Sequence, residues 1–145
     1  MLFRSKLIYF STNYVYEGKK GNYKETDPIL PINNYAWSKL GGESSVQMYK
    51  NSLILRVCMT EEPFIHKKAF SNVKTNFIFH KEVADILFKV LSLKGILNIG
   101  GKTQSPFNFG KKYNKNLKKK LAKKKFPRNP SMNIKKLKRL KISNN

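Results

Sequence analysis

The sequence predicts an α/β fold built around a layered, mostly parallel sheet, and three observations lead to that fold class. Short β-prone runs recur along the chain, at Lys6–Phe10, Ser52–Val57 and Ile96–Ile99. A helical segment is expected between the first two runs, and a clearly amphipathic one, His80–Leu91, precedes the third. Strands that alternate with helices in this way typically form a parallel sheet whose faces the helices cover.

The amino-terminal part is expected to run from a strand through a loop into a helix. Lys6–Phe10, with the sequence KLIYF, is a short apolar run typical of a buried parallel strand. Glu17–Asn33 is rich in turn formers and contains Pro28 and Pro31, so we expect a loop there. A loop of that length inside a compact domain is usually functional. A helix is predicted from about Asn34, which we interpret as its N-cap.

Two adjacent glycines, Gly41 and Gly42, fall inside this helix. Each weakens a helix by roughly 1 kcal/mol relative to alanine. We interpret the pair as a means of packing the helix closely against a sheet.

The middle of the chain contains three further strand candidates and the clearest helix. Ser52–Val57 predicts a second buried strand, Thr75–Phe79 a short third one and Ile96–Ile99 a fourth. His80–Leu91 places apolar residues at the i, i+3, i+4, i+7 spacing of one helix face. These residues are Val83, Ile86, Leu87 and Val90.

The remaining segments carry weaker patterns. Residues 60–74 mix polar and apolar residues without a period, so we expect irregular structure. Phe107–Tyr113 is expected to start another helix. The last thirty residues contain two Lys-rich runs that Pro127 and Pro130 separate. We therefore divide the chain into residues 1–110 and a Lys-rich segment, 111–145.

The formal net charge of +22 is unevenly distributed along the chain. Lys111–Lys141 contains 15 Lys and Arg and no acid, whereas all eight acidic residues lie between Glu17 and Asp85. A solvated, Lys-rich surface that reflects AT-rich codon usage is the favoured interpretation, and a polyanion-binding tail is the alternative. Only four of the 30 basic residues are Arg. Since proteins that read nucleic acid favour Arg, we do not expect nucleic acid as a partner.

Composition also argues against a membrane or secreted protein, a disulfide and a metal site. No apolar run approaches the ~20 residues that span a bilayer, and Met1–Leu7 has no signal-peptide pattern, so a cytoplasmic protein without a membrane partner is predicted. Cys58 is the only cysteine, which rules out an intramolecular disulfide. His66 and His80 are isolated in the sequence, and we expect no metal site.

Tyr35 and Lys39 form the chemically most informative pattern in the chain. Four residues apart on a helix, their side chains share one face. A neighbouring ammonium favours the phenolate and lowers the pKa of a tyrosine from about 10, which suits proton transfer to an alkoxide. Thr12 follows a predicted strand at the carboxyl end, where parallel sheets bind ligands. Its hydroxyl is suitably placed to polarise a carbonyl. A half-buried Tyr beside a solvated Lys is the alternative explanation of the pair.

Five segments surround that pair in a fixed order: STNYVYEG, YKETDPILPINNYAWSKLGGE, LILRV, NFIFHKEVADIL and LNIGG, followed by NPSMNIKKLKRL. Together they resemble the extended short-chain dehydrogenase/reductase (NAD-dependent epimerase/dehydratase) superfamily, within it most closely the dTDP-4-dehydrorhamnose reductase family. The resemblance covers roughly Leu7–Leu140. It implies a Rossmann-type sheet with a small substrate-binding lobe.

The resemblance also implies roles for individual residues. Tyr35 would donate the proton, Lys39 would tune it and hold the nicotinamide ribose, and Thr12 would contact the substrate carbonyl. Ser11 and Cys58 would lie at the cofactor, either NADPH or NADH. The substrate, a nucleotide sugar, would be bound by Thr12, Tyr14, Val15 and Tyr16. Arg56 is expected to form a structural ion pair instead of contacting the substrate.

Three departures from the family pattern are visible. Ala36 stands where the family usually has Gly, and CMTEEPF follows Val57 in place of the usual aromatic run. The third is that the Gly-rich nucleotide fingerprint is absent. The strand Lys6–Phe10 resembles the family's fifth, so we expect the amino-terminal nucleotide-binding βαβ units to be missing. We expect a chain that is inactive alone, with a separate chain supplying the missing half.

Three functions therefore remain open. The first is an NAD(P)H-dependent reductase of the 4-keto group of a dTDP-sugar, on the way to dTDP-rhamnose and cell-surface polysaccharide. The second is a non-catalytic family member that acts by binding a partner, as the regulatory β subunit of methionine adenosyltransferase does. The third is a Lys-rich polyanion binder, whose binding would depend steeply on salt.

Overall fold

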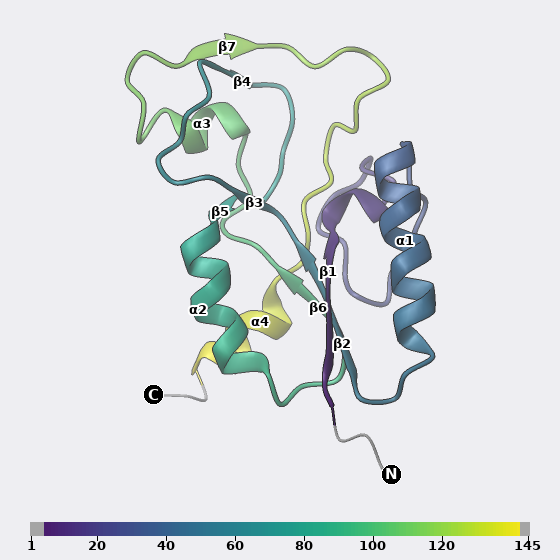
Figure 1. Ribbon diagram of the computed structural model, residues 1–145. Helices are drawn as coiled ribbons and strands as arrows, with labels where there is room; N and C mark the ends of the chain where they lie inside the picture. Colours follow the sequence, from purple (N-terminus) through teal and green to yellow (C-terminus); the bar gives the residue numbers. More distant parts are fainter. Residues whose placement is uncertain (1–4, 143–145) are drawn as a thin grey trace.

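The computed structural model describes residues 5–142, and its central element is a parallel sheet (Figure 1). Residues 1–4 and 143–145 lie outside the described part. They include the start of Met1–Leu7 and the outer ends of the segments 1–110 and 111–145. The sheet has the order β1-β2-β6, with β1 at Leu7–Thr12, β2 at Ser52–Val57 and β6 at Gly95–Ile99. Both strand pairs are parallel. The predicted parallel α/β sheet is confirmed.

Helices cover both faces of this sheet. Leu55 of β2 packs in one apolar cluster with Val83 and Leu137, which belong to two different helices, whereas Arg56, on the opposite face, reaches Glu43 of a third helix. The helices are α1 at Asn34–Gln47, α2 at His80–Val90 and α4 at Lys135–Ile142. We call β1, β2, β6, α1, α2 and α4 the sheet region. No helix within residues 5–142 is long and apolar enough to cross a membrane.

A second region, which we call the small lobe, stands above the carboxyl end of the sheet in Figure 1 and consists of residues 63–77 and 101–131. Its core packs aromatic rings with Ala69 and Leu117. Its elements are β4 at Lys68–Phe70, β7 at Lys118–Lys120 and α3 at Pro106–Gly110. β4 and β7 pair in parallel. Two short strands connect the lobe to the sheet region, β3 at Met59–Thr60 and β5 at Ile78–Phe79.

Several sequence-based element bounds need correction. β1 continues past Phe10, because Ser11 and Thr12 still pair with Arg56 and Val57. The N-cap of α1 is Asn33, not Asn34, since the Asn33 Oδ1 accepts a hydrogen bond from Ala36 N at 2.7 Å. The third strand is shorter than predicted.

Of Thr75–Phe79, only Ile78–Phe79 is a strand, and Thr75 instead forms an isolated antiparallel bridge with Gln104. The helix predicted at Phe107–Tyr113 lies at Pro106–Gly110. Residues 60–74, expected to be irregular, contain β4. Its partner β7 lies about fifty residues further along the chain, so a local pattern could not reveal the pairing.

The two glycines of α1 differ in what they contact. A Cβ built on Gly42 would lie 2.4 Å from Cζ of Tyr9 in β1, whereas a Cβ on Gly41 meets nothing within 4 Å. Close packing of the helix on the sheet is therefore confirmed for Gly42 alone.

Candidate active site

A cavity of about 220 Å³ lies where β1 and β2 end. The two strands are parallel and Thr12 pairs with Val57, so their carboxyl ends meet at one edge of the sheet. We call this the strand-end cavity. Four of the predicted site residues that line it come from these strand ends, and a fifth comes from α1. They are Ser11, Thr12, Tyr14, Cys58 and Tyr35.

Ser11 and Thr12 are both buried at the end of β1. Thr12 Oγ1 accepts a hydrogen bond from Tyr14 N at 3.2 Å and caps the short 3₁₀ helix η1, Asn13–Val15. Thr12 thereby holds Tyr14 against the cavity. Ser11 Oγ has no hydrogen-bond partner among the described residues although it is buried. Buried hydroxyls are normally paired, so the unpaired Ser11 hydroxyl is an unusual feature of the residues around this cavity.

The side chains of Tyr35 and Lys39 do not line the same cavity. Tyr35, in the first turn of α1, lines the cavity and is 55% exposed. Lys39 is not among the cavity residues, and its Nζ lies 4.6 Å from the centroid of the Tyr9 ring in β1. The structure therefore brings Thr12 and Tyr35 together, and places the ammonium of Lys39 one helical turn further along α1.

Burial dominates the electrostatics of the cavity wall. It raises the pKa of Tyr14 to about 12, with smaller contributions from Cys58 and Tyr35. Burial also raises the pKa of the Cys58 thiol to about 11, against a hydrogen bond with Thr75 that lowers it. Cys58 Sγ lies 2.8 Å from Thr75 Oγ1. Both groups are consequently neutral at physiological pH, and Cys58 is not an activated nucleophile.

Val15 and Tyr16, expected to contact substrate, lie in the core with no exposed surface. Neither lines the strand-end cavity. Tyr16 OH donates to Asn98 Oδ1 at 2.8 Å and accepts from Arg56 Nη1 at 2.9 Å.

Arg56 in turn forms a buried ion pair with Glu43, with 2.7 Å between Nη2 and Oε2. The expected structural ion pair of Arg56 is confirmed. Tyr16 belongs to the same buried network, which positions the strand ends instead of meeting a ligand.

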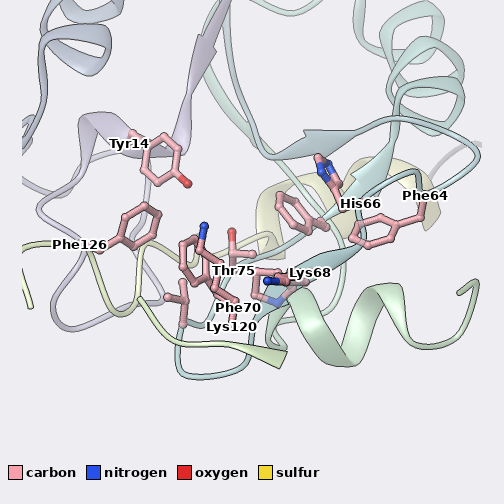
Figure 2. Close-up of a pocket in the computed structure, with 12 residues that line it drawn as sticks. Tyr14, Phe64, His66, Lys68, Phe70, Thr75, Lys120 and Phe126 are labelled. Atoms are coloured by element: carbon pink, nitrogen blue, oxygen red, sulfur yellow. The ribbon is translucent and has the colours of Figure 1, made fainter. Parts of the chain in front are cut away.

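A second cavity, of about 270 Å³, adjoins the first and belongs mostly to the small lobe (Figure 2). Tyr14 and Phe77 line both cavities. Its walls carry the rings of Phe64, Phe70 and Phe126 together with basic side chains. The basic side chains are His66, Lys68 and Lys120. We call this the aromatic cavity.

Sequence reasoning missed the aromatic cavity. Phe70 and Phe126 stand 4.8 Å apart between ring centroids, and Lys120 Nζ lies 5.1 Å from the Phe70 centroid. These residues come from the segment expected to be irregular and from the Lys-rich tail. Aromatic residues interleaved with lysines were the only local signal.

The structure resembles solved reductases of nucleotide sugars over nearly its whole length. A hypothetical dTDP-4-dehydrorhamnose reductase from Sulfolobus tokodaii is 26% identical, with a TM-score of 0.79 over 93% of this chain and 58% of that one. A dTDP-4-dehydrorhamnose reductase from Bacillus anthracis, solved with NADP, is 20% identical, with a TM-score of 0.78 over 92% and 58%. These likenesses confirm the Rossmann-type fold class.

Curated relatives match shorter segments. A dTDP-4-dehydrorhamnose reductase from Burkholderia thailandensis is 50% identical over 40 residues, which are 27% of this chain and 13% of the relative. Methionine adenosyltransferase 2 subunit beta from Danio rerio is 43% identical over 54 residues, 37% of this chain and 17% of the relative. The chain thus spans just over half of the solved structures, at 58%, and a smaller part of the curated relatives.

The family comparison covers the strand-end cavity except for His80. Residues 3–77, just over half of the 145 residues, match the RmlD substrate binding domain. This range contains β1, the η1 turn, α1 and β2, and with them Thr12, Tyr35 and Cys58. On that match, and with the resemblance of the whole fold, the chain belongs to the RmlD substrate binding domain family.

Proposed function

We propose that this chain forms the substrate-binding and proton-donating part of an NAD(P)H-dependent reductase of a keto group in a nucleotide sugar, of the dTDP-4-dehydrorhamnose reductase type. One observation carries the proposal. Thr12 and Tyr35, from two different elements, line one cavity at the carboxyl ends of parallel strands. Ligands of open α/β sheets bind at that edge.

Each residue of the pair has a distinct task. The Tyr35 hydroxyl donates its proton to the oxygen that becomes an alkoxide when the carbonyl is reduced. The Thr12 hydroxyl donates to Asn13 Oδ1 at 3.4 Å. With substrate bound it turns this hydrogen bond to the carbonyl oxygen of the substrate and orients that oxygen. Lys39 lies four residues after Tyr35 on α1 with its Nζ over the Tyr9 ring, so we assign it no contact with the Tyr35 hydroxyl in this step.

The aromatic cavity supplies the binding surface for the rest of the substrate. Its rings offer stacking faces for a base, and Lys68 and Lys120 offer positive charge for a diphosphate. Tyr14 and Phe77 line both cavities, so one elongated ligand can occupy both.

We assign the reactive end of the cofactor to the strand-end cavity. Ser11, whose Oγ is buried without a partner, and Cys58 both line this cavity. NADPH or NADH supplies the hydride when it is bound. The sequence has no Gly-rich fingerprint, so we assign the pyrophosphate of the cofactor to polypeptide other than residues 5–142.

The open edge of β1 is where such a polypeptide would pair. Among the described residues β1 has a hydrogen-bonded neighbour on one side only, β2. An unpaired strand edge is a ready template for another strand. Titration of the chain with NADPH and NADH tests this assignment, and saturable micromolar binding by these 145 residues alone would contradict it.

The proton-donor role is tested with Tyr35→Phe. The chain is joined to the amino-terminal half of a solved dTDP-4-dehydrorhamnose reductase, the part that this chain does not cover, and reduction of a dTDP-4-keto sugar is followed by NADPH absorbance. We expect turnover to fall about 10²- to 10⁴-fold, because general acid catalysis contributes that much. Tyr113→Phe, in the small lobe outside both cavities, is the matched control and should keep full turnover. Unchanged turnover in Tyr35→Phe would exclude the role.

The match to methionine adenosyltransferase 2 subunit beta favours a second candidate, a non-catalytic subunit that acts by binding a partner enzyme. The two candidates differ in a simple observation. A reductase oxidises NADPH only when the keto sugar is present and loses this activity with Tyr35→Phe. A binding subunit shows no such oxidation, and Tyr35→Phe leaves its partner affinity unchanged.

A further inference from the structure

A third cavity, which we call the polar cavity, lies in the small lobe away from the strand ends and has a volume of about 660 Å³. Three chain segments line it: residues 71–74, 102–108 and 128–129. It contains Lys74, Lys102 and Arg128 and no acidic residue, and its other walls are mostly hydroxyl and amide side chains. Val73 alone lines both the polar and the aromatic cavity, so the two are separate sites.

Backbone hydrogen bonds hold the three segments in place. Lys74 N donates to Arg128 O at 2.8 Å, which fixes the first segment to the third. Thr75 and Gln104 exchange two backbone hydrogen bonds, of 2.9 and 3.0 Å, which fix the first to the second. The three basic residues therefore extend from a bonded framework, which lowers the entropy cost of binding a ligand between them.

The guanidinium of Arg128 supplies a second observation, because its hydrogen-bonding capacity is not fully used. Its Nη1 is buried and has no hydrogen-bond partner among the described residues. Arg128, Lys74 and Lys102 also take no part in any ion pair found in residues 5–142. A buried donor on a charged group costs free energy when it is unpaired, and an anion is the acceptor that removes this cost.

We propose that the polar cavity binds a small anion that carries phosphate groups, with Arg128, Lys74 and Lys102 as its cationic contacts. Three cations without a carboxylate match a ligand with several negative charges. Thr103 and Asn108 offer further donors for phosphate oxygens. A volume of about 660 Å³ admits more than one phosphate group. The proposal does not depend on the reductase function, because the residues of the two sites differ.

Calorimetric titration of the whole chain with inorganic pyrophosphate at constant ionic strength tests the site. The variant Lys74→Gln/Lys102→Gln removes two cavity charges. Lys111→Gln/Lys112→Gln removes two charges from the same lobe outside the cavity and serves as the matched control. We expect the control to bind as the unchanged chain does and the cavity variant to bind at least tenfold more weakly. Equal weakening in both variants, or no saturable binding at all, would overturn the proposal.

A second variant tests the contribution of Arg128 and controls for misfolding. Arg128→Lys keeps the charge but loses the guanidinium fork, and circular dichroism verifies that it folds. We expect it also to weaken pyrophosphate binding, and undiminished affinity would remove Arg128 from the site.

Titration with dTDP then separates the sources of the phosphate. If the polar cavity takes nucleotides, dTDP displaces pyrophosphate in the control variant. If it takes free inorganic anions, dTDP binds without displacing pyrophosphate. Retained dTDP binding in the Lys74→Gln/Lys102→Gln variant also shows that the aromatic cavity is intact, so failure of one proposal is distinguishable from failure of the other.

Discussion

The sheet region and the small lobe are stabilised by different means. β1 and β2 pair over six residues and β2 and β6 over five, while β4 and β7 pair over only three. The sheet region contains a fully buried ion pair, Arg56–Glu43. The small lobe contains 14 Lys and Arg, three in residues 63–77 and eleven in 101–131, and no acid. Its core is mainly a group of packed aromatic rings.

The difference shows what each region needs charge for. In the sheet region one ion pair, Arg56–Glu43, is internal, and it ties α1 to β2. In the small lobe charge is of one sign and mostly at the surface, while ring packing supplies the cohesion. The cavities that we propose for anionic ligands lie in the lobe, and Tyr35, the proposed proton donor, lies on the sheet region.

The largest expected effect comes from breaking the buried pair. Glu43→Gln leaves the Arg56 guanidinium buried without a counter-charge, and we expect a loss of about 3–5 kcal/mol in the free energy of unfolding. Lys119→Gln, an exposed change in the lobe, should stay within about 0.5 kcal/mol. Urea unfolding of both variants measures the contrast. Similar losses in the two would mean that the regions do not differ in their use of charge.

A substitution of Cys58, where the sheet region meets the small lobe, should change how the free energy of unfolding depends on pH. Cys58, after β2, contacts Thr75 of the lobe, and burial raises its thiol pKa from 9.0 to about 11. Between these values the unfolded chain has released the proton and the folded chain retains it, so stability falls as pH rises. The slope is at most about 1.4 kcal/mol per pH unit for one group.

Cys58→Ala removes that contribution. We expect its free energy of unfolding to fall less steeply than that of the unchanged chain between pH 9 and 11, while the two curves run parallel from pH 6 to 8. Chemical unfolding at a series of pH values measures both curves. Curves that stay parallel above pH 9 would show that the thiol ionises normally in the folded protein.

A smaller effect compares packing in the two regions. A Cβ on Gly42 would overlap the ring and hydroxyl of Tyr9, and one on Gly110 would overlap the ring of Phe64. Overpacking typically costs about 1–3 kcal/mol. If side chains in the small lobe move aside more readily than those in the sheet region, Gly110→Ala should lower the free energy of unfolding less than Gly42→Ala.

Gly41→Ala is the control for the helix, because it meets no neighbour. It should stabilise the protein by about 0.5–1 kcal/mol, the gain of alanine over glycine inside a helix. Thermal unfolding ranks the three variants. A stabilising Gly42→Ala would show that Tyr9 moves aside without cost.

Sequence patterns predicted the sheet region well because its signals are local. Ser52–Val57 was assigned with its observed bounds, and α2 differs from its predicted range only at the last residue. The small lobe was not predictable in this way. β4 pairs with β7 across about fifty residues, and a three-residue strand carries no period of its own.

In the candidate site, too, local patterns predicted some features and could not predict others. Helical spacing placed Tyr35 and Lys39 on one helix, but it could not show that the Lys39 ammonium lies over the Tyr9 ring. The aromatic and polar cavities depend on contacts between distant segments, such as Lys74 with Arg128. No alternation or spacing within one segment encodes such contacts.

The chain forms the small lobe in two excursions from the sheet region, one between β2 and α2 and one between β6 and α4. Each excursion leaves the sheet region and returns to it, so the lobe is attached at four points. A single proteolytic cut in either excursion therefore cannot release the lobe. For protein engineering, the same arrangement means that both excursions must be exchanged together to transplant a ligand preference, because β4 from one pairs with β7 from the other.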